Sequence, residues 1–342
     1  MSPIRCLVAD DSRTFRAVLR AVLARAQGVE VVGEAEDGHQ AVAEVLRLRP
    51  DVVTMDVRMP GQDGLAAIAE IMERAPTPVI VVSAEVGREA QGLSFQALDL
   101  GAIEVLGKPR GDGAAFERDA EAIRRAVRAV AGLKLVTRRR RPAPPRLPPG
   151  AVSAAPVPAA IVGVVASTGG PPAIAALLRG LPAGFAAPVL VVQHIAAGFE
   201  AGFAHWLAAE AGRTVRVAAG GEPLTPGAIL VAPDGRHLVA RSGLVHLTDD
   251  PPVKGFRPAG NVLLEALARE YGARAAGLVL TGMGEDGVEG LRALRARGAP
   301  TAAQGPASSV VFGMPRVALE SGAAAEAVEA DDLAAWVTRV AR

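Results

Sequence analysis

The sequence has a single cysteine, almost no net charge and no long apolar run. With Cys6 alone, an intramolecular disulfide is excluded, which fits a reducing compartment. A net charge of +1 gives no overall electrostatic reason to expect a nucleic-acid partner. No window approaches the roughly 20 apolar residues of a membrane span. Asp10 and Asp11 also interrupt the first apolar run too early for a signal peptide. We therefore expect a cytoplasmic protein that is not inserted in a membrane.

The length and composition are those of a globular protein with two domains. Half of the 342 residues are hydrophobic and 21% are charged, which supplies ample material for buried cores. At about 100–200 residues per domain, the length predicts two domains. Over 134–158 the sequence is basic and proline-rich, and proline suits neither a continuing helix nor a central strand. We therefore predict domains at 1–133 and 159–342 with a linker between them. A nucleic-acid patch at Arg138–Arg141 is a weaker interpretation than a solvated linker.

The first domain alternates short β-rich runs with segments of helical periodicity. The strand candidates are 4–9, 29–35, 51–55, 79–83 and 103–106. The helix candidates are 15–26, 40–49, 65–74, 89–100 and 115–133. Five βα units predict an α/β fold with a flavodoxin-like, doubly wound parallel sheet. Ligands of such sheets bind at the carboxyl ends of the strands.

Polar residues of complementary chemistry follow these predicted strands. They are Asp10, Asp11, Asp56, Ser83 and Lys108. Three carboxylates at one edge repel each other unless a cation joins them, and Mg²⁺ prefers such oxygen ligands. One acid flanked by a metal, a hydroxyl and an ammonium suits phosphoryl transfer to Asp56. Each aspartate alone would more often be a helix cap, but the whole set favours a phosphoacceptor site.

The first domain resembles a two-component receiver. The resemblance is carried by Asp10-Asp11-Ser12, by the segment 54–60 and by Lys108-Pro109. It implies that Asp56 is the phosphoacceptor of a histidine kinase and that Ser83 and Lys108 sense the phosphoryl group. It also implies Mg²⁺ held by Asp11, Asp56 and the Arg58 carbonyl, with Asp10 in support. Receivers often carry an aromatic switch residue shortly before the lysine, where this chain has Ile103, Glu104 and Val105.

The second half returns to alternating strands and helices. The strand candidates are 160–166, 189–193, 214–218, 228–232 and 277–281. The helix candidates are 172–179, 199–211, 261–271 and 287–297. This pattern predicts a second α/β domain with a mainly parallel sheet.

Ser167 lies on a predicted strand-to-helix turn, followed by Thr168, Gly169 and Gly170. Such a turn exposes a nucleophile, and the helix N-terminus favours developing negative charge. A phosphate cradle has a similar outline, but this turn lacks the P-loop lysine and the full dinucleotide glycine pattern. The sequence thus favours a nucleophilic serine.

A serine nucleophile needs a base and an orienting acid. His194 follows the strand 189–193, and Asp286 lies in the glycine-rich turn 281–287 after another strand. Histidines at strand ends are more often structural, but His194 is the one predicted to share an edge with Ser167 and Asp286. The order Ser, His, Asp differs from those of chymotrypsin, subtilisin and the α/β-hydrolases.

From about Ala160 to Ala325 the chain resembles the catalytic domain of the chemotaxis protein-glutamate methylesterase family. The matching segments are 166–170, 193–194, 230–233, 282–287 and 313–315. The resemblance implies that Ser167 is the nucleophile, His194 the base and Asp286 its partner. Thr168 and Met283 would neighbour the oxyanion, and the esterase site would need no cofactor. The segments 195–197 and 257–261 depart from the family pattern.

The family hydrolyses glutamate γ-methyl esters of methyl-accepting chemoreceptors and can deamidate receptor glutamines. The resemblance also implies that the unphosphorylated receiver covers the active site. A degenerate esterase that only binds its partners is the main alternative. A DNA-binding regulator would need a helix-turn-helix, and the second half offers alternating strands instead.

Overall fold

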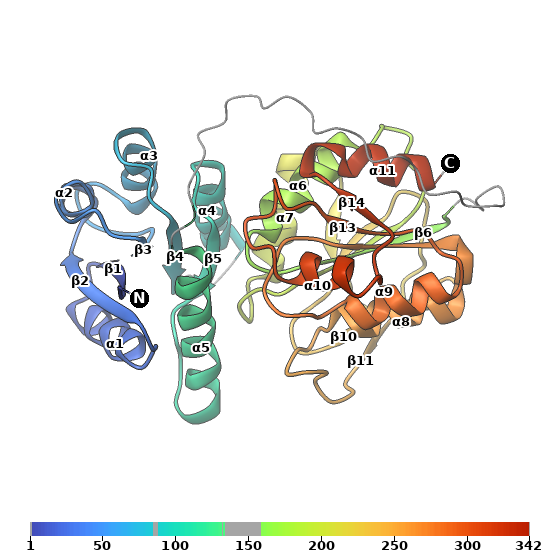
Figure 1. Cartoon of the computed structure of the whole chain (residues 1–342), viewed down its shortest axis with the longest axis horizontal. Helices are drawn as coiled ribbons and strands as arrows, with labels where there is room; N and C mark the ends of the chain where they lie inside the picture. The colour runs from blue at the N-terminus through green and yellow to red at the C-terminus, as the bar shows by residue number, and fades with distance from the viewer. Residues whose placement is uncertain (1, 85–87, 132, 134–158, 342) are drawn as a thin grey trace.

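The structure, a computed structural model, describes residues 2–84, 88–131, 133 and 159–341. Two parallel sheets lie side by side, each flanked by helices (Figure 1). The predicted two-domain α/β architecture is confirmed. The predicted linker, 134–158, falls outside the described residues, so the domain boundaries stay a prediction.

The N-terminal sheet has the strand order β2-β1-β3-β4-β5, and every strand pair is parallel. Its strands are β1 (Ile4–Ala9), β2 (Val29–Ala35), β3 (Val52–Met55), β4 (Val79–Ser83) and β5 (Glu104–Gly107). Its helices are α1 (Arg13–Ala24), α2 (Gly38–Leu48), α3 (Gly64–Arg74), α4 (Arg88–Asp99) and α5 (Gly113–Val130). This order is the flavodoxin-like one, with its switch point between β1 and β3.

Alternating side chains of β1 explain the two covered faces of this sheet. Cys6 and Val8 join a core with α1 and α5, whereas Leu7 and Ala9 join a core with α2, α3 and α4. Helix α1 is capped by Ser12, whose hydroxyl accepts from the Phe15 amide. The aspartates before Ser12 are therefore not needed as caps of this helix.

The C-terminal sheet has the order β14-β13-β12-β6-β7-β9-β8, again with parallel pairs throughout. Its strands are β6 (Ile161–Ala166), β7 (Val189–Gln193), β8 (Val215–Val217), β9 (Ile229–Val231), β12 (Ala275–Val279), β13 (Thr301–Gln304) and β14 (Glu326–Val328). Helices α6 (Gly170–Gly180), α7 (Glu200–Ala211) and α11 (Leu333–Val340) pack on one face. Helices α8 (Gly260–Glu270), α9 (Val288–Ala296) and α10 (Met314–Glu320) pack on the other. The mainly parallel sheet is thereby confirmed.

An antiparallel hairpin, β10 (His237–Arg241) and β11 (Leu244–Thr248), packs against α8 and was not predicted from the sequence. Its two-residue turn has φ of 53° at Ser242 and 74° at Gly243. Positive φ at both turn positions matches the twist of a hairpin. Strands β13 and β14 and helices α10 and α11 were also not predicted.

An aromatic cluster joins the two domains. Phe95 on α4 lies 5.7 Å from Phe203, 6.0 Å from Trp206 and 6.4 Å from Phe199, measured between ring centroids. The Trp206 indole donates a 3.2 Å hydrogen bond to Asp99. Figure 1 shows α4 and the edge strand β5 on the side of the N-terminal domain that faces α7. The α4 and β5 side of the first domain is therefore packed against the second.

Candidate functional site

Ser167 follows β6 on a sharp turn into α6. Gly169 adopts φ 75°, and a Cβ there would lie 2.5 Å from Val310. Glycine therefore meets both the backbone and the steric demand of this turn. The Ser167 amide donates to Thr281 O at 3.0 Å, and the Thr281 hydroxyl donates to Thr168 O at 2.9 Å. These bonds fix the turn against the end of β12.

His194 follows the neighbouring strand β7 at the same sheet edge. Its amide donates to Ala166 O at 3.0 Å. The Gln193 side-chain amide donates to the carbonyls of Ser167 and His194, both at 2.9 Å. Ser167, Thr168, His194 and half-buried Met283 border one cavity of about 440 Å³. The structure thus brings the predicted serine, histidine and oxyanion region together.

Asp286 is 2% exposed and receives four hydrogen bonds. His194 Nε2 lies 2.9 Å from one carboxylate oxygen. The other donors are the amides of Gly260 at 2.5 Å, Asn261 at 3.0 Å and Gly287 at 3.0 Å. Burial alone would raise the pKa of Asp286, but His194 and the amides of Asn261 and Gly260 outweigh burial and hold the pKa below its usual value. Asp286 is therefore a buried, ionised partner of the imidazole.

The Asp286 bond assigns a role to each ring nitrogen of His194. An ionised carboxylate can only accept, so Nε2 carries the proton in the neutral ring. Nδ1 then holds the lone pair, is buried, and has no hydrogen-bond partner within the described residues. The imidazole is accordingly set up to take a proton at Nδ1.

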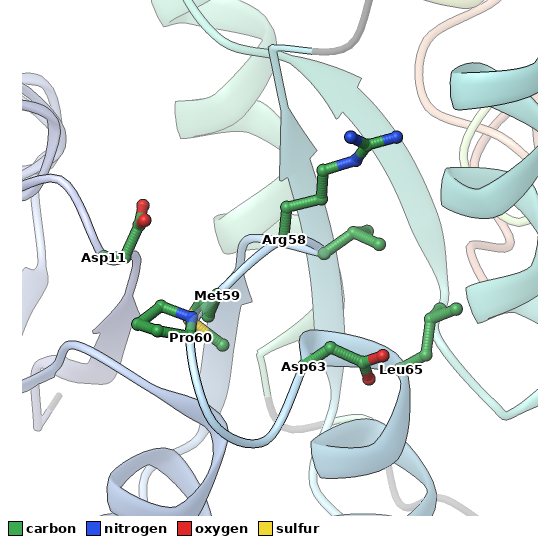
Figure 2. A pocket seen from close by; sticks show the side chains of 7 residues that line it. Asp11, Arg58, Met59, Pro60, Asp63 and Leu65 are labelled. Atoms are coloured by element: carbon green, nitrogen blue, oxygen red, sulfur yellow. The ribbon is translucent and has the colours of Figure 1, made fainter.

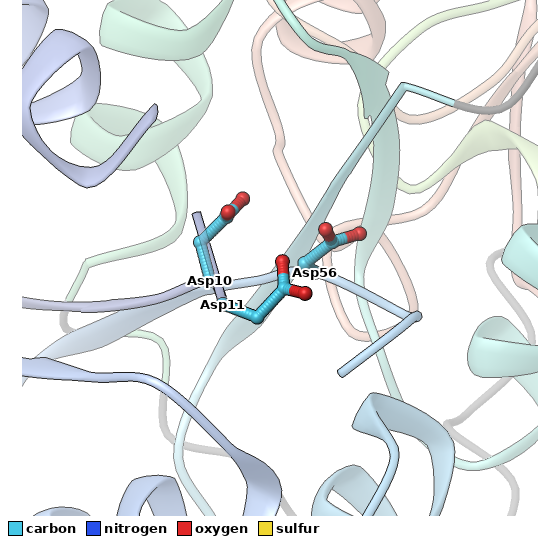
Figure 3. A group of neighbouring side chains, drawn as sticks. All are labelled: Asp10, Asp11 and Asp56. Atoms are coloured by element: carbon cyan, nitrogen blue, oxygen red, sulfur yellow. The ribbon is translucent and has the colours of Figure 1, made fainter. Parts of the chain in front are cut away.

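Three carboxylates meet at the carboxyl edge of the first sheet. Ligand oxygens of Asp10, Asp11 and Asp56 all lie within 4.8 Å of one another (Figure 3). Lys108 Nζ lies 2.5 Å from Asp10 and 2.7 Å from Asp56. Burial alone would lower the pKa of Lys108, but its bonds to both acids raise the pKa above the usual value. Three carboxylates and one ammonium leave two negative charges, which fit a divalent cation with oxygen ligands.

The remaining predicted residues border this cluster. Ser83 ends β4, and its carbonyl accepts from the Lys108 amide at 2.8 Å. Asp11 and Arg58 border a cavity of about 360 Å³ beside the carboxylates (Figure 2). All predicted receiver residues thus lie around one edge.

Residues of the first domain also border the cavity of Ser167, among them Glu104 and Arg125. Burial raises the pKa of Glu104 to about 7, although the Thr168 side chain and the Arg125 charge act to lower it. The Arg125 guanidinium lies 5.8 Å from the centre of the Phe256 ring. That ring stacks on His194. The one feature of the sequence that pointed to these contacts is the carboxyl of Glu104, at a place where receivers often carry an aromatic residue.

A buried histidine outside the predicted triad also supports the site. His237 is 0% exposed, and its Nδ1 accepts from the Ala259 amide at 3.2 Å. Ala259 immediately precedes the Gly260 and Asn261 amides that bind Asp286. His237 therefore holds the backbone in place at the start of α8. The sequence around His237 contains no motif that predicts this contact with Ala259.

Within the described residues, no helix combines the length and the apolar character needed to span a bilayer. Residues 6–117 match the family described as response regulator receiver domain. Residues 162–337 match the family described as CheB methylesterase.

Relatives match the chain over nearly its whole length. A protein-glutamate methylesterase/protein-glutamine glutaminase of Anaeromyxobacter dehalogenans is 48% identical over 97% of this chain and 95% of its own. One of Myxococcus xanthus is 45% identical over 99% of this chain and 98% of its own. The crystal structure of the Thermotoga maritima CheB methylesterase catalytic domain gives a TM-score of 0.51 at 33% identity, covering 54% of this chain and 99% of that one. The chain therefore belongs to the CheB methylesterase family and carries a receiver domain ahead of its methylesterase domain.

Proposed function

We propose that this protein hydrolyses glutamate γ-methyl esters on methyl-accepting chemoreceptors under the control of receiver phosphorylation, and that it also deamidates receptor glutamines. The observation that carries the proposal is the buried Asp286–His194 pair, which leaves Nδ1 unprotonated on a histidine that borders the same cavity as Ser167. A module that only bound its partners would not need this arrangement.

The proposed reaction begins with attack of Ser167 Oγ on the ester carbonyl. His194 Nδ1 takes the serine proton and then gives it to the departing methoxide, which leaves as methanol. Water attacks the acyl-enzyme by the same proton path, releasing the glutamate and restoring the serine. Asp286 stabilises the imidazolium through Nε2. The oxyanion would lie against the Thr168 and Met283 region, where the N-terminus of α6 favours negative charge.

We propose Asp56 as the phosphoacceptor of a chemotaxis histidine kinase. Asp10, Asp11, Asp56 and the Arg58 carbonyl would hold Mg²⁺, which would neutralise charge on the phosphoryl oxygens when bound. Ser83 and Lys108 would then contact the phosphoryl group. Lys108 follows β5 directly, so a changed position of Lys108 would be transmitted to Glu104 on that strand.

We further propose that the unphosphorylated receiver closes the esterase site. Support comes from the cavity of Ser167, which is also bordered by Glu104, Leu106 and Arg125 of the receiver. A methylated receptor helix would need this space. Phosphorylation would shift the population toward a state in which the receiver has moved away.

The proposed location is the cytoplasm, where a histidine kinase supplies the phosphoryl group. The single, buried Cys6 fits a reducing compartment. We also propose the boundaries 1–133, 134–158 and 159–342 for receiver, linker and catalytic domain.

The test is methanol release from methylated chemoreceptor, with and without a small phosphodonor. We expect release by the wild-type chain, a faster rate with the phosphodonor, and none from Ser167→Ala. Receptor binding without methanol release in every state would favour the degenerate binding module instead.

A further inference from the structure

The Phe256 ring is stacked face to face on the His194 imidazole. The ring centroids are 4.0 Å apart and the planes differ by 5°. Among the described residues, the His194 ring nitrogens have one hydrogen-bond partner, Asp286 on Nε2. A single bond leaves the ring free to turn about the N···O axis. A flat partner on one face restricts that rotation and so fixes where Nδ1 points.

The backbone that carries Phe256 is itself fixed. Val253 and Phe256 exchange two backbone hydrogen bonds of 3.0 Å each. The residues between them, Lys254 and Gly255, have φ of 50° and 86°, the pattern of a tight two-residue hairpin turn. Lys254 also forms an ion pair with Glu285, the neighbour of Asp286. The hairpin and the Asp286 loop are therefore tied together on either side of the imidazole.

The stack also matters when His194 carries charge. During ester hydrolysis the imidazole becomes an imidazolium, and a cation on an aromatic face is attracted by the ring quadrupole. The Phe256 ring is also approached by Arg125 of the receiver, whose guanidinium lies 5.8 Å from the ring centre. One phenyl ring thus contacts both the proposed base and the domain that is proposed to close the site.

We propose that Phe256 is a positioning residue for His194, holding the imidazole plane and favouring its protonated form during ester hydrolysis. This inference rests on the proposed esterase function. Phe256 lies in the segment 253–256, just before the segment 257–261 that departs from the family pattern.

The experiment uses the full chain with a phosphodonor and compares wild type, Phe256→Leu and Phe256→Tyr. Leucine keeps an apolar side chain but removes the aromatic face, whereas tyrosine restores it. We expect kcat for methanol release to fall about 5- to 30-fold in Phe256→Leu, the range of a desolvated cation–π contact, with KM within about twofold of wild type. Phe256→Tyr should recover most of kcat.

A spectroscopic measurement reports the stack directly. The ring current of Phe256 should shift the His194 Cε1–H resonance upfield in wild type and in Phe256→Tyr. That shift should disappear in Phe256→Leu, while circular dichroism and melting temperature show that the variant is folded.

Arg125→Ala is the control, because it removes the other charged group that approaches the Phe256 ring. It should raise the rate without phosphodonor and leave kcat with phosphodonor near the wild-type value. The inference is overturned if Phe256→Leu keeps wild-type kcat, if its main effect is on KM, if tyrosine does not rescue kcat, or if Arg125→Ala lowers kcat equally. Absence of methanol release from the wild-type chain would instead overturn the proposed function.

Discussion

At the scale of single residues, the chemistry of the site depends on which imidazole nitrogen meets which partner. In the serine proteases of the chymotrypsin type, the aspartate binds Nδ1 and Nε2 is the base. Here Asp286 binds Nε2, and Nδ1 is the nitrogen left with a lone pair. The sequence predicted the three residue types but could not predict this reversal, because it depends on the direction from which α8 and the Asp286 loop approach the ring.

This assignment predicts different results for the three triad positions. Ser167→Ala and His194→Ala should each lower kcat roughly 10⁴-fold or more, because neither group has a substitute in the cavity. Asp286→Asn should also be severely impaired, since an amide that donates to Nε2 moves the ring proton to Nδ1 and blocks the base. Steady-state methanol release with phosphodonor measures all three.

Glu289→Gln is the matched control for the Asp286 variant, because Glu289 is exposed on α9 and pairs with Arg292. It should behave as wild type. Wild-type kcat in Asp286→Asn would show that the carboxylate does not set the tautomer.

The buried carboxyl of Glu104 predicts a pH-dependent closure. Burial raises the pKa of Glu104 to about 7 from an ordinary 4.5. A receiver that has moved away would expose this carboxyl and return its pKa toward the ordinary value. The closed state then binds the proton more tightly, so closure is most stable below pH 4.5 and is progressively weakened as the pH rises to about 7. The charge of Arg125 acts to lower this pKa, and Arg118, Asp119, His194 and Asp234 also border the cavity.

The measured quantity is the ratio of methanol release without phosphodonor to that with phosphodonor, from pH 5.5 to pH 7.5, about the window of the Glu104 titration. The ratio cancels the titration of the catalytic groups. It should rise with pH in wild type and stay flat in Glu104→Gln, which has no carboxyl to ionise. An equally steep rise in Glu104→Gln would assign the effect to another group.

At the scale of elements, apolar strands and amphipathic helices were predictable, whereas strands without a β-rich pattern were not. Strands such as β4 and β7 consist of apolar runs that a buried parallel strand requires. Strand β14 has three residues, and β13 reads Thr-Ala-Ala-Gln, so neither carries a β-rich pattern. The hairpin β10–β11 could have been found, because Ser242-Gly243 is a turn signal between two β-rich runs.

The same contrast holds for the candidate site. Ser167, His194 and Asp56 were predictable because they follow strands, and the topology of a parallel sheet brings strand ends together. Phe256, Glu104 and Arg125 were not, since each acts through a partner that is distant in sequence. The place of Phe256 follows from the hairpin at 253–256, and the places of Glu104 and Arg125 follow from the packing of one domain on the other.

The cluster of three aspartates and Lys108 at the edge of the receiver sheet predicts phosphorylation at Asp56. Wild-type chain with Mg²⁺ and a small phosphodonor should incorporate acid-labile phosphate, and Asp56→Asn should incorporate none, because an amide is not a nucleophile for phosphoryl transfer. Glu36→Gln, an exposed acid just after β2, is the control and should be labelled normally. Undiminished labelling of Asp56→Asn, or labelling that survives removal of Mg²⁺ by chelation, would place the acceptor or its chemistry elsewhere.

At the scale of the whole molecule, the two domains pack together so that residues of the receiver and residues of the esterase site border one cavity. The aromatic cluster around Phe95 supplies apolar contact, while Glu104 and Arg125 place charged groups beside the esterase site. The apolar contact favours closure whether or not Asp56 is phosphorylated. The charged contacts depend on β5 and α5, the elements next to Lys108, and so are the ones that phosphorylation can alter.

This arrangement predicts that the fragment 159–342 releases methanol faster than the unphosphorylated full chain. If closure is favoured by ~2 kcal/mol, the open population and hence the rate are reduced about 30-fold. Removing the receiver should recover much of that factor, as should a phosphodonor acting on the full chain. The comparison is steady-state methanol release from methylated receptor at equal enzyme concentrations, with Ser167→Ala fragment as the blank.

Phe95→Ala in the full chain offers a second route to the open state, because it removes the central ring of the interface without touching the triad. This variant should also raise the rate without phosphodonor. Equal rates for fragment and unphosphorylated full chain would contradict closure and leave the triad intact, since the fragment contains Ser167, His194 and Asp286.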